Sequence, residues 1–161
     1  MKLNLSYILP LFTFALAACD NKKEMNHSTN DKALVFPKGE KITNDNFTGT
    51  AYLQMLIATD SLNATAIGNV TFEPSARTKW HSHPGGQILL VTDGVGYYQE
   101  KGQPKKILRK GDAIKCPPNV PHWHGASADT AFVQLAVTNN EKGPVVWMEK
   151  VTDSHYKSSN Q

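Results

Sequence analysis

The sequence predicts an all-β fold, either a barrel or a sandwich, for most of the chain. From about residue 47 onward, short runs rich in Val, Ile, Thr and aromatic residues recur, each bounded by Gly, Pro, Asn or Asp. No stretch shows a sustained helical period, and many short strands are typical of antiparallel barrels and sandwiches. The length of 161 residues suits one domain with a hydrophobic core.

Ten strands are expected in this part of the chain. They span 51–58, 65–73, 78–83, 86–92, 95–101, 104–109, 112–116, 121–125, 130–138 and 144–150. Asp93-Gly94 predicts a tight turn, residues 101–104 predict a hairpin, and residues 110–112 predict another. Cys116 lies on an expected strand, where a lone cysteine is typically a small buried hydrophobe.

The most specific chemical signal is a set of histidines on two expected strands. His81 and His83 are two residues apart, Gln87 shares their parity, and His122 and His124 share a parity of their own. Alternate side chains of a strand point to the same face. A barrel that places the two segments side by side would therefore bring three imidazoles and a carboxamide oxygen to one point, which predicts a metal site.

The predicted ligands are His81, His83, Gln87 and His122. Imidazole and amide oxygen suit borderline cations such as Mn, Fe, Co, Ni or Zn. Four protein ligands on an octahedral ion leave two positions for water or substrate. Because Gln87 is neutral, the site keeps the full charge of the ion, which favours Lewis acidity and attraction of anionic oxygen.

Two further residues are candidates for catalysis. His124 shares a face with His122, so it should point into the barrel beside the metal, where an imidazole titrates in a useful range. The alternative is an interior histidine bonded to a backbone carbonyl. Gln134 either faces the same cavity and hydrogen-bonds a substrate, or points outward. Leu89 and Val91 continue the parity of Gln87 and predict apolar cavity walls.

The first 18 residues predict a secretory signal. Lys2 precedes a mostly apolar run that is too short and too interrupted to span a bilayer, which takes about 20 apolar residues. Residues 16–19 (Leu-Ala-Ala-Cys) resemble a bacterial lipobox, which implies cleavage before Cys19 and lipidation of that residue. We therefore expect a membrane-anchored lipoprotein that faces the periplasm or the cell exterior.

Four regions follow from this pattern: a signal in 1–18, a lipidated cysteine and flexible tether in 19–46, the β domain in 47–152, and a polar tail in 153–161. His27 and His155 fall in the tether and the tail, and neither is expected to bind metal. The formal net charge is only +3, and no dense basic stripe with interleaved aromatics occurs. Nucleic acid is therefore not an expected partner.

Two motifs make the chain similar to small single-domain cupins, whose fold is a double-stranded β-helix, or jelly-roll barrel. The first motif comprises His81, His83, Gln87 and Gly94, with glutamine in place of the usual glutamate. The second comprises Gly111, Pro117 or Pro118, Asn119 in the place of a glycine, and His122. Asn accepts left-handed backbone better than most residues, so this departure is mild.

Within that family, the chain resembles the bacterial cupin hydroxynitrile lyases and their uncharacterised relatives. The matching segments are 47–50, 70–74, 76–78, 80–81, 83–84, 122–125 and 147–149. The resemblance implies manganese or iron held by His81, His83, Gln87 and His122, and a barrel that cleaves or forms cyanohydrins. Those lyases carry a basic histidine where this chain has Gln134, and glutamine cannot exchange protons near neutral pH.

Three functions are compatible with these residues. The first is a metal-dependent enzyme that acts on a small oxygenated molecule by Lewis-acid chemistry of the lyase, isomerase or hydrolytic kind, with His124 as proton carrier. The second is an iron-dependent cupin dioxygenase. The third is a non-catalytic cupin that captures a metal or metabolite at the membrane. The resemblance also implies a homodimer.

Overall fold

The computed structural model describes residues 34–158. The signal in 1–18, Cys19 and His27 lie outside these residues. The described part contains the following elements: β1 (Glu40–Lys41), β2 (Phe47–Thr48), β3 (Ala51–Ile57), β4 (Thr65–Phe72), β5 (Arg77–Thr78), β6 (His81–Ser82), β7 (Gln87–Glu100), β8 (Lys106–Arg109), β9 (Ala113–Cys116), β10 (His122–Ala126), β11 (Phe132–Asn139), β12 (Val146–Trp147) and α1 (Asp153–Lys157). The prediction of an all-β fold is confirmed.

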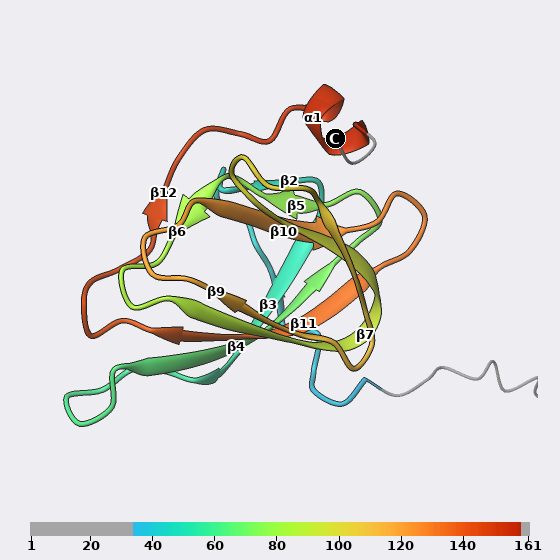
Figure 1. Ribbon diagram of the computed structural model, residues 1–161. Coiled ribbons are helices and arrows are strands. Elements are labelled where there is room, and N and C mark those ends of the chain that lie inside the picture. Colours follow the sequence, from blue (N-terminus) through green and yellow to red (C-terminus); the bar gives the residue numbers. More distant parts are fainter. Residues whose placement is uncertain (1–33, 159–161) are drawn as a thin grey trace, which may run out of the picture. The chain divides into compact units, whose positions relative to one another are not determined.

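The strands form two antiparallel layers that curl toward each other (Figure 1). One layer contains β1, β3, β4, β11, β9 and the first half of β7; the other contains β2, β5, β10, β6, β12, β8 and the second half of β7. β7 therefore belongs to both layers and joins them. Inward side chains of the two layers enclose the core, in which Phe72, Leu89 and Phe132 are fully buried.

The prediction of a tight turn at Asp93-Gly94 is wrong. β7 runs without interruption through both residues, and the register against β11 shifts between Val133 and Gln134. Gly94 has a φ of +77°, and a Cβ atom there would lie 1.9 Å from the Ala131 carbonyl oxygen. The glycine thus allows an irregularity that bends one strand from the first layer into the second, instead of reversing the chain.

The two other predicted turns differ in outcome. Residues 101–104 close a hairpin between β7 and β8, with Gly102 at a φ of +80°. Residues 110–112 form a turn, but β8 and β9 do not pair with each other. Both strands pair with β7, β8 with its second half and β9 with its first. The turn therefore carries the chain from one layer to the other.

The chain segments on either side of the predicted β domain are structured where they are described. The sequence predicts a flexible tether up to residue 46, yet β1 pairs with β3, and the side-chain amide of Asn69 donates to the Pro37 carbonyl oxygen over 2.9 Å. The sequence likewise predicts a polar tail from residue 153, where the structure forms α1. Among residues 34–158, no helix has the length and apolar character needed to cross a membrane.

Helix α1 packs on the outside of the second layer through one buried aromatic residue. Thr152 caps its first turn by accepting from the His155 amide. The Tyr156 ring lies 5.9 Å from the Trp123 ring, and its hydroxyl donates to the Ala126 carbonyl oxygen over 2.8 Å. The Arg77 guanidinium sits 4.6 Å from the same ring. A single apolar anchor was too weak a periodic signal to predict this helix from sequence.

Arg77 also bonds to the residues around the start of α1. Its guanidinium donates to the Val151 carbonyl oxygen and pairs with Asp153 over 2.5 Å. From the sequence, Arg77 is expected either to cap the strand or to pair with a carboxylate such as Glu73, but Glu73 pairs with Lys38 instead. The buried guanidinium therefore ties β5 to the residues that lead into α1.

Substitution of Tyr156 tests how firmly α1 is attached. We expect Tyr156→Ala to lower the free energy of unfolding by about 3 kcal/mol, because a buried ring is lost. Tyr156→Phe should lower the free energy of unfolding by about 1 kcal/mol, because the hydrogen bond of the hydroxyl is lost. The exposed Lys157 offers the control, with Lys157→Ala expected to change stability by less than about 0.5 kcal/mol. Urea denaturation measures all three, and equal stability of the three variants would mean that α1 does not contribute to the fold.

Candidate metal centre

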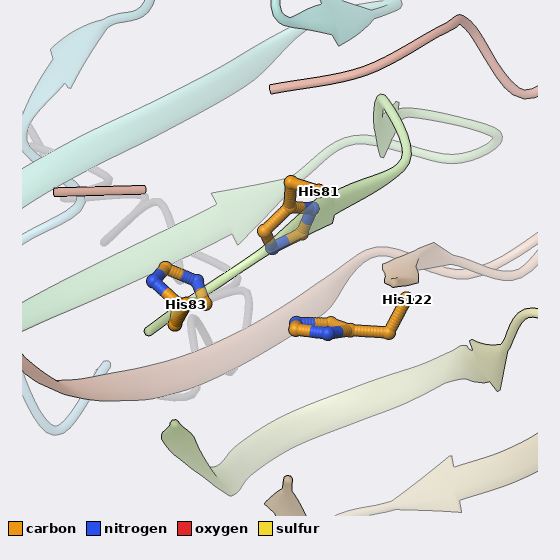
Figure 2. A group of neighbouring side chains, drawn as sticks. All are labelled: His81, His83 and His122. Carbon is orange, nitrogen blue, oxygen red and sulfur yellow. The ribbon is translucent and has the colours of Figure 1, made fainter. Parts of the chain in front are cut away.

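The antiparallel pairing of β6 with β10 creates the centre of the site. His122 lies directly opposite His81 in the register of these two strands. Their rings are 4.4 Å apart between centroids, and the His83 ring lies 5.2 Å from His81 and 5.7 Å from His122. Each of the three residues places a ring nitrogen within 4.8 Å of the others. Figure 2 shows the three rings converging from two segments that are far apart in the sequence.

Two backbone carbonyls orient the facing imidazoles. His81 Nδ1 lies 3.0 Å from the Lys79 oxygen, and His122 Nδ1 lies 2.9 Å from the Val120 oxygen. A carbonyl oxygen only accepts, so each Nδ1 carries the proton and each Nε2 keeps a free lone pair. This arrangement is the usual one for histidines that bind metal. His122 Nε2 and both nitrogens of His83 are buried without a hydrogen-bond partner among the described residues.

Gln87 is held next to the imidazoles by a neighbouring strand. It opens β7 opposite Thr138 of β11, and its side-chain nitrogen donates to the Thr138 hydroxyl over 3.0 Å. This bond leaves Gln87 Oε1 as the free atom, buried without a hydrogen-bond partner in the described part of the chain. The Gln87 amide oxygen and one imidazole nitrogen from each of the three histidines form a donor set that fits a divalent transition metal.

The turns that carry these residues are bonded to each other. The Gly86 and Asn119 amides each donate to the His83 carbonyl oxygen over 3.0 Å. Asn119 has a φ of +60°, as its place in the second motif predicts. The loop before His122 is therefore attached to the loop after His83, which keeps the two groups of ligands in register.

Burial and mutual repulsion keep the histidines neutral. Burial lowers the pKa of His81 well below its ordinary value, and the neighbouring His122 and His83 lower it further. Burial likewise lowers the pKa of His83 to about 4, with a smaller contribution from His122, and burial is also the main cause of the lowered pKa of His122. Neutral rings near pH 7 have lone pairs ready for a cation.

His124 and Gln134 form a buried pair beside this group. His124 Nδ1 lies 3.0 Å from Gln134 Nε2, and the His124 ring is 5.2 Å from the His81 ring. Burial lowers the pKa of His124 well below its ordinary value. His124 lines the inner cavity, whereas Gln134 lies behind it, fully buried, and does not reach the cavity wall.

The cavity is small and mostly apolar. Its volume is about 140 Å³. Its walls are made by Phe47, Val70, Thr78, His81, His83, Gln87, His124, Ala136, Val145 and Trp147. Leu89 and Val91 are buried as their parity predicts, yet they are not among the lining residues. The Trp147 ring packs 4.9 Å from the His81 ring, so this residue belongs to the site and not only to barrel packing.

Three contributors to the site are not predicted from the sequence: Thr138, Trp147 and the carbonyls that orient the imidazoles. Thr138 shares the parity of Gln134 on β11, which would have placed it inside the barrel. Its pairing with Gln87 depends on strand register, which no local pattern specifies. Cys116 is buried and free, as predicted, and burial raises its pKa to about 12. His155 bonds to Gln99 outside the cavity.

Comparison with known proteins agrees with this geometry. A family model of the cupin domain matches residues 68–148. A protein from Granulicella tundricola named (R)-mandelonitrile lyase is 43% identical over 114 residues, covering 70% of this chain and 87% of that protein. A protein from Alcanivorax borkumensis named acireductone dioxygenase is 30% identical over 77 residues, covering 46% of this chain and 41% of that protein.

Solved structures show the same fold. The crystal structure of a cupin-like protein from Thermotoga maritima has a TM-score of 0.73 and 48% sequence identity, covering 76% of this chain and 94% of the other. The family match spans both histidine segments and the strands that hold them. The chain therefore belongs to the cupin family.

Proposed function

We propose that this cupin binds one divalent transition metal and is an enzyme that acts on a small oxygenated molecule by Lewis-acid, lyase-type chemistry similar to that of hydroxynitrile lyases. One observation carries the proposal: nitrogen atoms of three histidines lie within 4.8 Å of one another, and Gln87, whose amide oxygen is buried without a partner among the described residues, lines an apolar cavity of about 140 Å³ together with His81 and His83. The similarity to the mandelonitrile lyase of Granulicella tundricola supports the class of reaction.

The proposed ligands are His81, His83, Gln87 and His122. We favour manganese, which the resemblance to the hydroxynitrile lyases implies, and Fe, Zn, Ni and Co are the alternatives that imidazole and amide ligands also suit. When bound, such a cation supplies Lewis acidity toward an oxygen of the substrate. The four ligands are neutral, so they would not offset the charge of the ion.

The other residues of the cavity would bind and orient the substrate. Phe47, Val70 and Trp147 give it an apolar wall, which excludes water and admits only a compact ligand. His124 is the proposed proton carrier, because its Nε2 has no partner among the described residues. Gln134 would act on the substrate through His124, since it touches His124 and not the cavity.

Two other functions remain candidates. The similarity to the acireductone dioxygenase of Alcanivorax borkumensis favours an iron-dependent dioxygenase. A non-catalytic cupin that captures a metal or a metabolite would use the same ligands. Consumption of dioxygen by the iron-loaded protein would identify the dioxygenase. Retention of a metabolite without turnover would identify the non-catalytic cupin.

The cellular location and the oligomeric state are also part of the proposal. The lipobox-like residues 16–19 support lipidation of Cys19 and a lipoprotein anchored in a bacterial membrane, facing the periplasm or the cell exterior. The resemblance to small cupins supports a homodimer. The substrate of a protein anchored in this way would be a small molecule that reaches the periplasm or the cell exterior.

Metal content is the first test. We expect the purified protein to carry close to one transition-metal ion per chain by elemental analysis, because the donor set has no other partner. The double variant His81→Ala, His83→Ala should carry none. His155→Ala is the matched control and should keep its metal, since His155 bonds to Gln99 away from the site. Metal-free wild-type protein after growth with each candidate metal would contradict the proposal.

The orientation of Gln87 gives a second prediction. Thr138→Val keeps the shape of the side chain but removes the hydroxyl that accepts from the Gln87 amide. Loss of such an orienting bond typically weakens metal binding by about 10- to 100-fold, and we expect a loss in this range by competition with a chelator. Thr92→Val removes a hydroxyl from β7 away from the ligands and serves as the control. Equal affinity of both variants would exclude Gln87 as a ligand.

A mandelonitrile cleavage assay tests the proposed chemistry. We expect the manganese-loaded Gln134→His variant to cleave faster than the wild type by about 100-fold, because a titratable base is added behind the cavity. A gain confined to the variant would show that the natural substrate of the wild type is a different molecule. If metal-loaded wild type and variant were both inactive, the hydroxynitrile-lyase chemistry would be excluded.

A further inference from the structure

We infer that Gln134 fixes His124 in the tautomer that carries its proton on Nε2, so that His124 presents a hydrogen-bond donor, and not a base, to the cavity. The ligand that this tautomer implies rests on the proposed function. That ligand is a small molecule with an exposed acceptor, such as a carbonyl or carboxylate oxygen, held beside the three histidines.

The contact between the two side chains carries the inference. Gln134 Nε2 lies 3.0 Å from His124 Nδ1, and both residues are buried. An amide nitrogen only donates, and a neutral imidazole has one donor and one acceptor nitrogen. Nδ1 must therefore accept, which leaves the proton on Nε2.

The orientation of the Gln134 amide decides between the two tautomers. With nitrogen toward His124, one amide N–H is bonded and the Oε1 atom is left without a partner among the described residues. With the amide reversed, Oε1 would accept from the imidazole, and the proton would lie on Nδ1 instead. The structure has the first orientation, with the amide nitrogen 3.0 Å from His124 Nδ1, and the proposal follows from that contact.

The free nitrogen of His124 belongs to the cavity. Nε2 has no partner in the described part of the chain, and the ring lies edge-on to Phe72, 5.7 Å away between centroids. His124 is close to His81, yet it is not part of the group of three histidines whose nitrogens converge. A nitrogen that carries a proton has no lone pair for a cation. The contact with Gln134 thus keeps His124 available to the substrate.

A fixed N–H donor selects one kind of ligand. It stabilises an acceptor atom or a developing negative charge, because a preorganised donor in an apolar cavity contributes more than one in water. In this tautomer His124 can act as the proposed proton carrier only by giving a proton to the ligand, because the protonated Nε2 cannot take one from a hydroxyl group. The preferred ligand is therefore one that arrives with a free lone pair at this position, and a small carboxylate is the simplest representative.

Nitrogen-15 NMR of the histidine side chains tests the tautomer directly. The full chain, labelled at histidine and freed of metal, is compared with a His124→Phe variant to assign the His124 signals. We expect the wild type to show protonated Nε2 and bare Nδ1. In Gln134→Glu, where the carboxylate can only accept, the proton should move to Nδ1. Gln103→Glu makes the same change at an exposed residue and should leave the His124 signals unchanged.

A proton on Nδ1 in the wild type would overturn the inference, and so would an unchanged tautomer in a folded Gln134→Glu variant. If that variant does not fold, the wild-type spectrum alone decides. Because the measurement uses metal-free protein, it is independent of the proposed metal and reaction. Conversely, failure of the wild type to bind metal would contradict the proposed function but not the conclusion about the His124 tautomer.

Binding of formate to the zinc-loaded protein tests the implied ligand. We expect His124→Phe, which keeps a ring but removes the donor, to weaken formate binding by at least about tenfold in calorimetry, since hydrogen bonds to charged groups are strong. Tyr52→Phe changes a residue outside the cavity lining and should bind formate as the wild type does. Equal binding by wild type and His124→Phe would exclude His124 as the donor.

Discussion

The pairing of β6 with β10, which sets His81 opposite His122, is the constraint on which the rest of the structure depends. β6 is only two residues long, so this register is held by its surroundings: by the Lys79 and Val120 carbonyls at the two rings, and by the Asn119 amide on the His83 carbonyl oxygen. A shift by one residue would turn one imidazole out of the barrel. The centre therefore depends on a short strand bonded along both of its edges.

The site destabilises the fold that surrounds it. Each buried polar atom without a partner costs about 1–3 kcal/mol, and the atoms without partners at the site include His83 Nδ1, His122 Nε2 and Gln87 Oε1. The lowered pKa values of the imidazoles have the same origin, since burial without a counter-charge disfavours the protonated form. A cation that binds only the folded chain would offset this cost and stabilise the domain.

The parity of residues along a strand predicted the three histidines and the burial of Leu89, because alternation is local. The fold class followed from turn residues between short apolar runs. The path of β7 could not be predicted in this way: Asp93-Gly94 has the composition of a turn, and only pairing with β11 makes it a bend within one strand. The partnership of Gln87 with Thr138, and of His124 with Gln134, depends on register between distant strands. Helix α1 depends on one buried ring.

The four neighbouring histidines of the site, His81, His83, His122 and His124, show how a partner at one nitrogen decides the role of the other. At His81 and His122 a backbone carbonyl accepts from Nδ1, which leaves Nε2 bare for a cation. At His124 an amide donates to Nδ1, which places the proton on Nε2 and directs a donor at the ligand. His83 has no partner at either nitrogen among the described residues, so no hydrogen bond fixes its tautomer. In the proposed site, one type of side chain would thus supply both metal ligands and a substrate contact, and the difference lies in the atoms that contact Nδ1.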